Sequence, residues 1–323
     1  MSVALGITLF RPTVQSLLQS VEQAEEAGIP MVWVPSEPVG PDSLTALAIV
    51  AARTRKIQLG SGIAVTYSRH PVTLANQALA IAEVAPERFR LGIGVSHPFV
   101  VERMYGLPFQ KPMEYLREYV GILRGLLWNG EVKQQGKHFS VDVQLPATSV
   151  PPRTPLILAA VQKNMFRLAG EIADGAMVSW GLLSYMKTVA LPALQEGAAL
   201  AGRPVPGVIA SAPVIYSTDF TQVRQVAYQA LGRYVYMPVY QKLFADAGFP
   251  LLPDLRPSDE LIKEMFIYGD DATILHRLGA IYEAGIDEVQ VAAYPAQDPL
   301  REELAIMNLL GEFARKNSAR QSS

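Results

Sequence analysis

Residues 57–97 read IQLGSGIAVTYSRHPVTLANQALAIAEVAPERFRLGIGVSH. This stretch holds two apolar runs, residues 57–63 and 89–95, and each run ends in glycines and polar side chains. Between them, residues 71–85 begin with a proline and keep apolar side chains at helical spacing. The pattern predicts a strand, a helix and a second strand, with strand ends that let a flat, polar molecule approach the backbone closely.

The same alternation of apolar runs and helical patterns recurs along the chain. The runs that predict strands cover residues 3–9, 31–34, 57–63, 89–95, 155–160, 176–180, 208–216 and 288–293. Two insertions interrupt them, residues 129–152 with an exposed hairpin pattern and residues 234–268, rich in Tyr, Met and Pro. Strands that alternate with helices, without the glycine fingerprint of a Rossmann fold, favour a single (β/α)8 TIM barrel over residues 1–323. An open parallel sheet with fewer strands is the alternative.

Composition and charge exclude several classes of protein. Half of the 323 residues are hydrophobic, which supports a large core, and a net charge of −2 offers no basic surface for nucleic acid. Cysteine is absent, which removes disulfides and thiolate chemistry, and no two of the four histidines share a metal-ligand spacing, so no metal site is expected. Without a basic leader or an apolar run of membrane-spanning length, the sequence predicts a soluble, cytoplasmic protein.

In a (β/α)8 barrel the reacting groups lie at the carboxyl ends of the strands. This rule selects the residues that follow the predicted strands, which are Thr8, Ser36, Glu37, Ser61, Gly62, Ile63, Ser96, His97, Val161, Gln162, Lys163, Asn164, Ser179, Trp180 and Tyr294. The set contains one histidine and one glutamate, the side chains best suited to proton transfer.

Three blocks of sequence resemble the luciferase-like superfamily of flavin and deazaflavin oxidoreductases. They are LGSG at 59–62 with RHP at 69–71, RFRLGIGVSH at 88–97, and ADG at 173–175 before a strand that ends in tryptophan. The resemblance extends over nearly the whole chain, and GVSH followed by MYG at 104–106 is most similar to the branch that uses coenzyme F420. It implies a (β/α)8 barrel with an inserted segment and F420 as the cofactor, with FMN as the alternative.

The resemblance also implies where the cofactor lies. In the superfamily the third strand ends in a bulge with a non-prolyl cis peptide against the cofactor ring, a place matched here by Ser61, Gly62 and Ile63. The cofactor phosphate is held after the fifth strand, a segment matched by Ala160, Val161, Gln162, Lys163 and Asn164. Helix N–H groups, a cap from Asn164 and the charge of Lys163 suit a dianion.

Four further residues complete the expected cofactor site, namely Ser96, His97, Ser179 and Trp180. A simpler interpretation exists for each part of this site. The glycines would then only ease the packing of barrel strands, and Lys163 would be a solvated lysine in an ordinary loop.

His97 and Glu37 are the expected catalytic residues. His97 matches the position where related sugar-phosphate dehydrogenases place a carboxylic acid near the hydride-accepting carbon. Glu37 follows Ser36 where many members carry a histidine after an aspartate, and this departure argues against sugar-phosphate dehydrogenase activity. A carboxylic acid in an apolar pocket ionises less readily, which would suit Glu37 to proton transfer. A structural histidine and a surface carboxylate are the alternatives.

The second insertion is rich in aromatic side chains. With Trp180 it would form the apolar wall of a substrate pocket, through Tyr234, Tyr236, Tyr240 and Phe244. An insertion before the last βα unit lies over the barrel mouth, where a lid would exclude water from hydride transfer. Packing of the same rings in the core is the alternative.

The leading hypothesis is a coenzyme F420-dependent oxidoreductase that transfers a hydride between the deazaflavin and a small organic substrate, while His97 or Glu37 exchanges the proton. An FMN-dependent luciferase-like monooxygenase and a non-catalytic flavin-binding barrel are the alternatives. The missing His and Cys clusters disfavour a metal-dependent hydrolase. A homodimer is expected from the resemblance, and the small side chains of residues 74–85 would pack either on a second copy or on the barrel's own strands.

Overall fold

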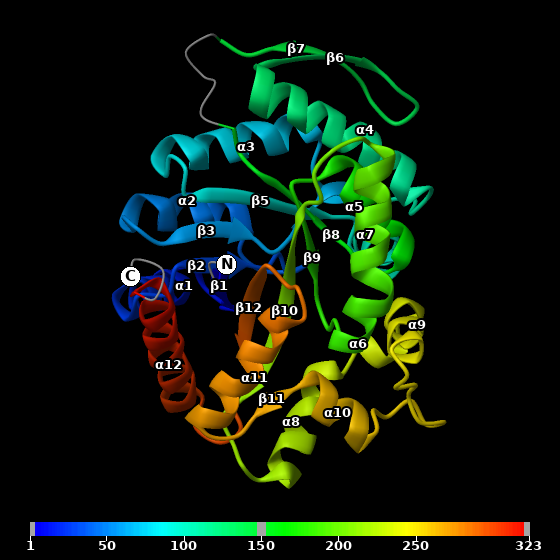
Figure 1. Cartoon of the computed structure of the whole chain (residues 1–323). Helices are drawn as coiled ribbons and strands as arrows, with labels where there is room; N and C mark the ends of the chain where they lie inside the picture. The colour runs from blue at the N-terminus through cyan, green and yellow to red at the C-terminus, as the bar shows by residue number, and fades with distance from the viewer. Residues whose placement is uncertain (1–3, 147–152, 320–323) are drawn as a thin grey trace.

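The computed structural model describes residues 4–146 and 153–319, and its centre is a closed barrel of parallel strands (Figure 1). In barrel order the strands are β1 (Ala4–Thr8), β2 (Met31–Val34), β3 (Gln58–Ser61), β5 (Phe89–Gly94), β8 (Leu156–Ala159), β9 (Gly175–Val178), β10 (Gly207–Ile215) and β12 (Glu288–Ala293). The ring closes because β10 pairs with both β9 and β12, and β12 pairs with β1. The predicted (β/α)8 barrel is confirmed.

Two short strands extend the barrel at its carboxyl end. β4 (Ala64–Val65) continues the line of β3 beyond a break and pairs with β5. β11 (Ile267–Tyr268) pairs with the last residues of β10. Both short strands lie at the carboxyl end, where the site is predicted. This end therefore contains more strand structure than the alternation of apolar runs predicts.

Helices follow the strands and cover the outside of the barrel (Figure 1). They are α1 (Val14–Ala27), α2 (Ser43–Arg53), α3 (Pro71–Val84), α4 (Pro112–Arg124), α5 (Lys163–Ile172), α6 (Leu183–Tyr185), α7 (Leu191–Leu200), α8 (Phe220–Leu231), α11 (Asp271–Glu283) and α12 (Pro299–Ala319). Several expected helix ends are confirmed. Thr13 caps α1 by accepting the N–H of Ser16, and Gly28 ends it at φ 83°, a conformation that favours glycine.

The two insertions lie at different places on the barrel. The first contains the antiparallel hairpin β6 (Glu131–Gln135) and β7 (Ser140–Gln144), which lies beside α4 in Figure 1. Residues 147–152, which end the predicted insertion, lie outside the described residues. The second insertion contains the short helix η6 (Tyr234–Tyr236), α9 (Pro238–Asp246), α10 (Asp259–Met265) and β11.

Trp33 on β2 fills the inside of the barrel. Its ring is fully buried, and a Cβ atom on Gly60 would lie 2.3 Å from it, so the neighbouring strand needs glycine at that position. The indole Nε1 donates to Glu288 Oε1 at 2.8 Å, and Arg90 lies over the ring with Nη1 2.7 Å from Glu288 Oε2. Because Arg90 and Glu288 stand at the start of their strands, this ion pair closes the amino end of the barrel, opposite the predicted site.

Most of the small side chains of α3 pack inward, whereas Ala80 is exposed. Ala75, Ala78 and Ala82 are buried within the chain's own core, which supports packing on the barrel itself and leaves them unavailable to a second copy. The expected homodimer stays a prediction. Within residues 4–146 and 153–319, no helix combines the length and apolar character that a membrane crossing requires.

Candidate functional site

The chain forms a bulge where β3 gives way to β4. Gly62 donates its N–H to the carbonyl of Val34 at 2.8 Å, and the peptide bond between Gly62 and Ile63 is cis, as the resemblance implies. The hydroxyl of the fully buried Ser61 donates to the carbonyl of Gly92 at 2.8 Å. Ser61 therefore fastens β3 to β5, while Gly62 and Ile63 remain half-buried at the barrel mouth.

Two glycines of β5 make room for this bulge. A Cβ atom on Gly92 would lie 2.0 Å from the carbonyl oxygen of Ser61, far closer than the non-bonded contacts that Cβ atoms make in proteins. On Gly94, a Cβ atom would lie 3.0 Å from Ile63 Cδ1. The glycine spacing in residues 88–97 is thus explained by the path of the neighbouring strand, and it shapes the surface that the resemblance assigns to a cofactor ring.

His97 lies directly beyond β5. The residue before it, Ser96, has φ 61°, a left-handed conformation that is uncommon for a side chain other than glycine. The imidazole of His97 is half-buried, and its ring centre lies 5.7 Å from that of Tyr240 in the second insertion. Burial, and then the positive charge of Arg233, lower the pKa of His97 below its usual value. The imidazole is therefore neutral around pH 7.

Glu37 is more exposed to solvent than a carboxyl group enclosed in an apolar pocket would be. Its side chain is 45% exposed, and Oε2 lies 3.6 Å from Nη2 of Arg233. The reason is local: the connection from β2 to α2 contains three prolines and a glycine within residues 35–41 and runs along the surface. This exposure agrees with the surface carboxylate that the sequence also allows, and the catalytic role of Glu37 stays a prediction.

The predicted phosphate segment lies at the start of α5. Ala160 is buried, whereas Lys163 and Asn164 are exposed in the first helical turn. The expected cap from Asn164 is wrong, because Gln162 has the extended backbone of the cap residue and the helix begins at Lys163. The Gln162 side chain instead donates to the carbonyl of Val239 at 2.7 Å, while Val161 is half-buried.

Trp180 and Ser179 follow β9 and differ sharply in exposure. Ser179 is exposed, while Trp180 has φ 58° and is only 5% exposed. The indole packs among three rings whose centres lie 5.3 to 5.9 Å away, those of Tyr234, Phe266 and Tyr294. This packing favours a structural role for Trp180 beneath the insertion, and its contact with a cofactor stays a prediction.

The aromatic residues of the second insertion divide into two groups. Tyr240 and Phe244 are buried in the core, whereas Tyr236 is 70% exposed. The insertion nevertheless touches several strand ends. Besides the contacts of Tyr240 and Tyr234, Val239 accepts from Gln162, and the carbonyl of Ala247 accepts from Ser184 at 3.1 Å. These contacts agree with an insertion that covers the barrel mouth. The function of the insertion as a lid stays a prediction.

The predicted residues lie on one rim. β3 pairs with β5, β5 with β8, and β8 with β9, so Gly62, His97, Lys163 and Ser179 follow four consecutive strands of the barrel. Glu37 follows β2, the neighbour of β3 on the other side. The expectation that these residues share one end of the barrel is confirmed.

Two cavities flank Glu37. One, of about 420 Å³, lies between the connections that follow β1 and β2, and its walls include Phe10, Val39 and Glu37. The other, of about 210 Å³, is polar and includes Ser36, Arg69 and Glu37. His97 and Lys163 line neither cavity. Sequence patterns do not indicate the first cavity, because its apolar walls combine loop residues such as Phe10 and Val39 with Leu17 of α1 and Ala46 of α2.

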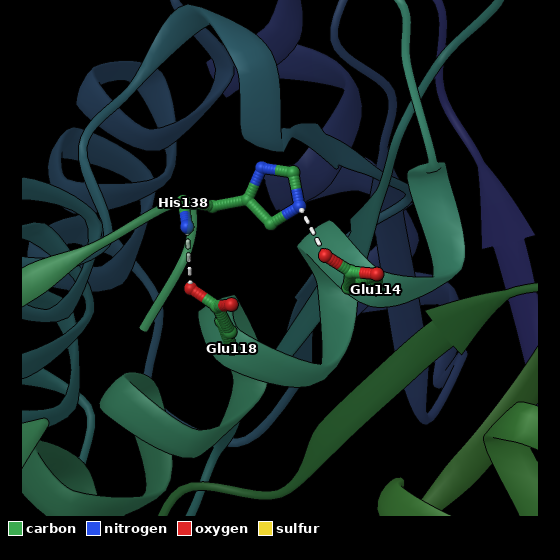
Figure 2. Close-up of side chains that lie close together, drawn as sticks. All are labelled: Glu114, Glu118 and His138. Atoms are coloured by element: carbon green, nitrogen blue, oxygen red, sulfur yellow. Dashed lines mark hydrogen bonds and ion pairs between the residues drawn. The ribbon is translucent and has the colours of Figure 1, made fainter. Parts of the chain in front are cut away.

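Glu114, Glu118 and His138 form a cluster between α4 and the hairpin (Figure 2). The carboxylate of Glu118 on α4 accepts the backbone N–H groups of Lys137, His138 and Phe139 at 2.8 to 3.0 Å. The imidazole points toward Glu114, with Nε2 3.5 Å from Oε1, and the Lys137 ammonium lies 3.4 Å from the same oxygen. N–H groups and a positive charge already engage these carboxylates, so the cluster fastens the hairpin to α4.

The closed barrel, with candidate site residues at the carboxyl ends of its strands, places this chain among the (β/α)8 barrel enzymes. Residues 4–288 match the model of the luciferase-like monooxygenase family, and the chain belongs to that family. A Mycobacterium tuberculosis relative, provisionally named a coenzyme F420-dependent oxidoreductase, is 27% identical over 326 residues, covering 88% of this chain and 92% of the relative. The 5,10-methylenetetrahydromethanopterin reductase of Methanopyrus kandleri is 24% identical over 327 residues, covering 90% and 93%.

Solved structures share the fold at low sequence identity. The F420-dependent tetrahydromethanopterin reductase of M. kandleri has a TM-score of 0.77 at 22% identity and covers 96% of this chain and 98% of its own. An F420-dependent secondary alcohol dehydrogenase has a TM-score of 0.80 at 18% identity, and the match covers 97% of this chain and 98% of the dehydrogenase. An FMN-containing Baeyer–Villiger monooxygenase of Pseudomonas putida has a TM-score of 0.74 at 18% identity, and the match covers 96% of this chain and 97% of the monooxygenase.

Proposed function

We propose that this enzyme binds coenzyme F420 at the carboxyl rim and transfers a hydride between the deazaflavin and a small organic substrate. The observation that carries the proposal is the alignment of three consecutive strand ends, where the Gly62 bulge, His97 and the start of α5 follow β3, β5 and β8. A relative with F420 in its name matches 88% of this chain, which favours this cofactor over FMN.

The residues present fit such a cofactor. The glycine-lined bulge offers backbone surface to a flat ring, and at α5 the cap residue makes no side-chain bond to the first turn, which leaves this helix start suited to a phosphate. When bound, the deazaflavin supplies the hydride chemistry. His97 is neutral and half-buried, so its imidazole can accept a proton that the substrate releases, and Lys163 offers a positive charge to the phosphate.

Side-by-side binding of F420 and FMN to the purified protein tests this function. We expect saturable binding of F420 followed by its fluorescence, and reduction of F420 by a hydride donor from a panel of small alcohols. Binding of FMN alone, with consumption of oxygen when reduced FMN is supplied, would show that the monooxygenase alternative is correct. That alternative is kept because an FMN monooxygenase shares the fold. Binding of F420 without turnover of any donor would favour the non-catalytic alternative.

Replacement of Lys163 should weaken the phosphate site. We expect Lys163→Gln to raise the Kd for F420 about tenfold, since a charge-assisted contact at an exposed position is worth about 1.5 kcal/mol. Lys56→Gln is the matched control, because Lys56 is also exposed but precedes β3 at the opposite end of the barrel. Equal Kd values for the wild type and the Lys163 variant in a fluorescence titration would remove Lys163 from the site.

A further inference from the structure

Three arginines surround one carboxylate at the amino end of the barrel. Arg153 precedes β8, Asp174 directly precedes β9, and Arg203 lies between α7 and β10. Arg153 Nη2 donates to Asp174 Oδ1 at 2.5 Å, and Arg203 Nη2 lies 3.8 Å from the same oxygen. Arg124, the last residue of α4, contacts the same group through Trp128. The guanidinium carbon of Arg124 lies 4.6 Å from the centre of the indole ring, and that of Arg153 lies 4.1 Å from it.

The positive charge of this arginine cluster, Arg124, Arg153 and Arg203, is only partly balanced. In the part of the chain that the structure describes, Asp174 is the one carboxylate that forms ion pairs with these guanidiniums, so one negative charge faces three positive ones. Burial has the largest effect on the pKa of Arg124 and lowers it, Asp174 raises this pKa, and Arg203 and Arg153 lower it. The sequence of residues 147–152, directly before Arg153, contains no acidic residue that would add a counter-charge.

Two guanidinium nitrogens of the arginine cluster are buried donors. Arg124 Nε and Arg203 Nη1 have no hydrogen-bond partner among the described residues. Buried N–H groups nearly always have an acceptor, because an unsatisfied one costs free energy. Asp174 is already engaged, since Oδ1 accepts from Arg153 and Oδ2 accepts the N–H of Leu156 at 2.9 Å. The cluster therefore combines unbalanced positive charge with unsatisfied donors, the two properties that a bound oxyanion requires.

We propose that the arginine cluster binds an oxyanion of the phosphate type, at the end of the barrel opposite the proposed cofactor site. Guanidinium groups match phosphate oxygens with pairs of parallel N–H donors, and several of them together balance a charge of about −2. A free phosphate ion and the phosphate group of an organic molecule share this chemistry. The proposal does not depend on F420, because the phosphate contact proposed for F420 at the start of α5 lies at the carboxyl end.

Titration of the cofactor-free protein with inorganic phosphate, in chloride buffers of constant ionic strength, tests the proposal. Trp128 contacts two of the guanidiniums, so we expect a saturable change in tryptophan fluorescence that is absent in Trp128→Phe. Arg124→Gln and Arg153→Gln should each raise the Kd for phosphate about tenfold, the effect of losing one charge-assisted hydrogen bond. Arg153 is 59% exposed, so its substitution tests the site without disturbing the core.

Arg224→Gln is the matched control for these variants. Arg224 also lies over an aromatic ring, that of Phe220 at 5.0 Å, but it is held by both oxygens of Asp259 at 2.7 Å. This variant should bind phosphate with the wild-type Kd.

Phenyl phosphate, titrated in parallel, separates the two sources of the anion. Tighter binding of inorganic phosphate would support a site for the free ion, and tighter binding of phenyl phosphate would support a site for a phosphorylated organic molecule. The absence of a saturable change with either compound, or the same Kd in the wild type and in both variants of the arginine cluster, would overturn the proposal. The three arginines would then serve only to fasten α4 and the strand starts to one another.

Discussion

Replacement of Glu288 by alanine should destabilise the protein by about 3 kcal/mol or more, because it leaves Arg90 without its counter-charge and Trp33 without its acceptor. The side chain of Glu288 is 5% exposed, and its two oxygens bond to Trp33 Nε1 at 2.8 Å and Arg90 Nη1 at 2.7 Å. Urea denaturation at pH 7 measures the loss. Glu288→Gln keeps an acceptor for the indole and removes only the charge, so its loss should be smaller.

Asp142→Asn provides the control for this prediction. Asp142 pairs with Lys133 on the hairpin at 2.7 Å, but the two side chains are 70% and 83% exposed. Exposed ion pairs contribute about 0–1 kcal/mol, so the free energy of unfolding should change by less than about 0.5 kcal/mol. Similar small losses in the Glu288 and Asp142 variants would contradict the view that the ion pair at the amino end holds the barrel together.

The sequence predicts the features of the fold that depend on local periodicity, namely the positions and order of the barrel strands. Every barrel strand was located within one or two residues over its described part, because buried parallel strands read as short apolar runs. The rule that places chemistry at the carboxyl ends then brought Gly62, His97 and Lys163 to one rim. These inferences need only the order of elements along the chain.

Contacts between distant residues could not be predicted in this way. Glu288 begins a strand that reads as apolar, and its partners Trp33 and Arg90 are 255 and 198 residues away. The pairing of Glu37 with Arg233 likewise joins a loop to an insertion, so local patterns allow an exposed Glu37 but do not indicate its partner. The prediction of the residue that caps α5 was wrong for a local reason. Asn164 is the better capping residue by type, but Gln162 has the backbone conformation of the cap.

Gly92→Ala should have the second large effect, because it introduces an atom where the bulge passes. The new Cβ would lie 2.0 Å from the carbonyl oxygen of Ser61, a backbone atom held in place by the barrel, so β3 or β5 must shift. Overpacking of this kind costs about 1–3 kcal/mol, and a clash with backbone belongs at the upper end of that range. The shift would also displace Gly62 and Ile63, and the proposed function then predicts a higher Kd for F420.

Gly279→Ala is the matched control for Gly92→Ala. Gly279 lies inside α11, and a Cβ atom there would meet nothing within 4 Å. Alanine in an open helical position stabilises a protein by about 0.4–1 kcal/mol, so the two Gly→Ala substitutions should change the melting temperature in opposite directions. A Gly92→Ala protein that melts like the wild type and binds F420 equally well would show that the bulge tolerates a different path, and that its glycine-lined shape does not determine cofactor binding.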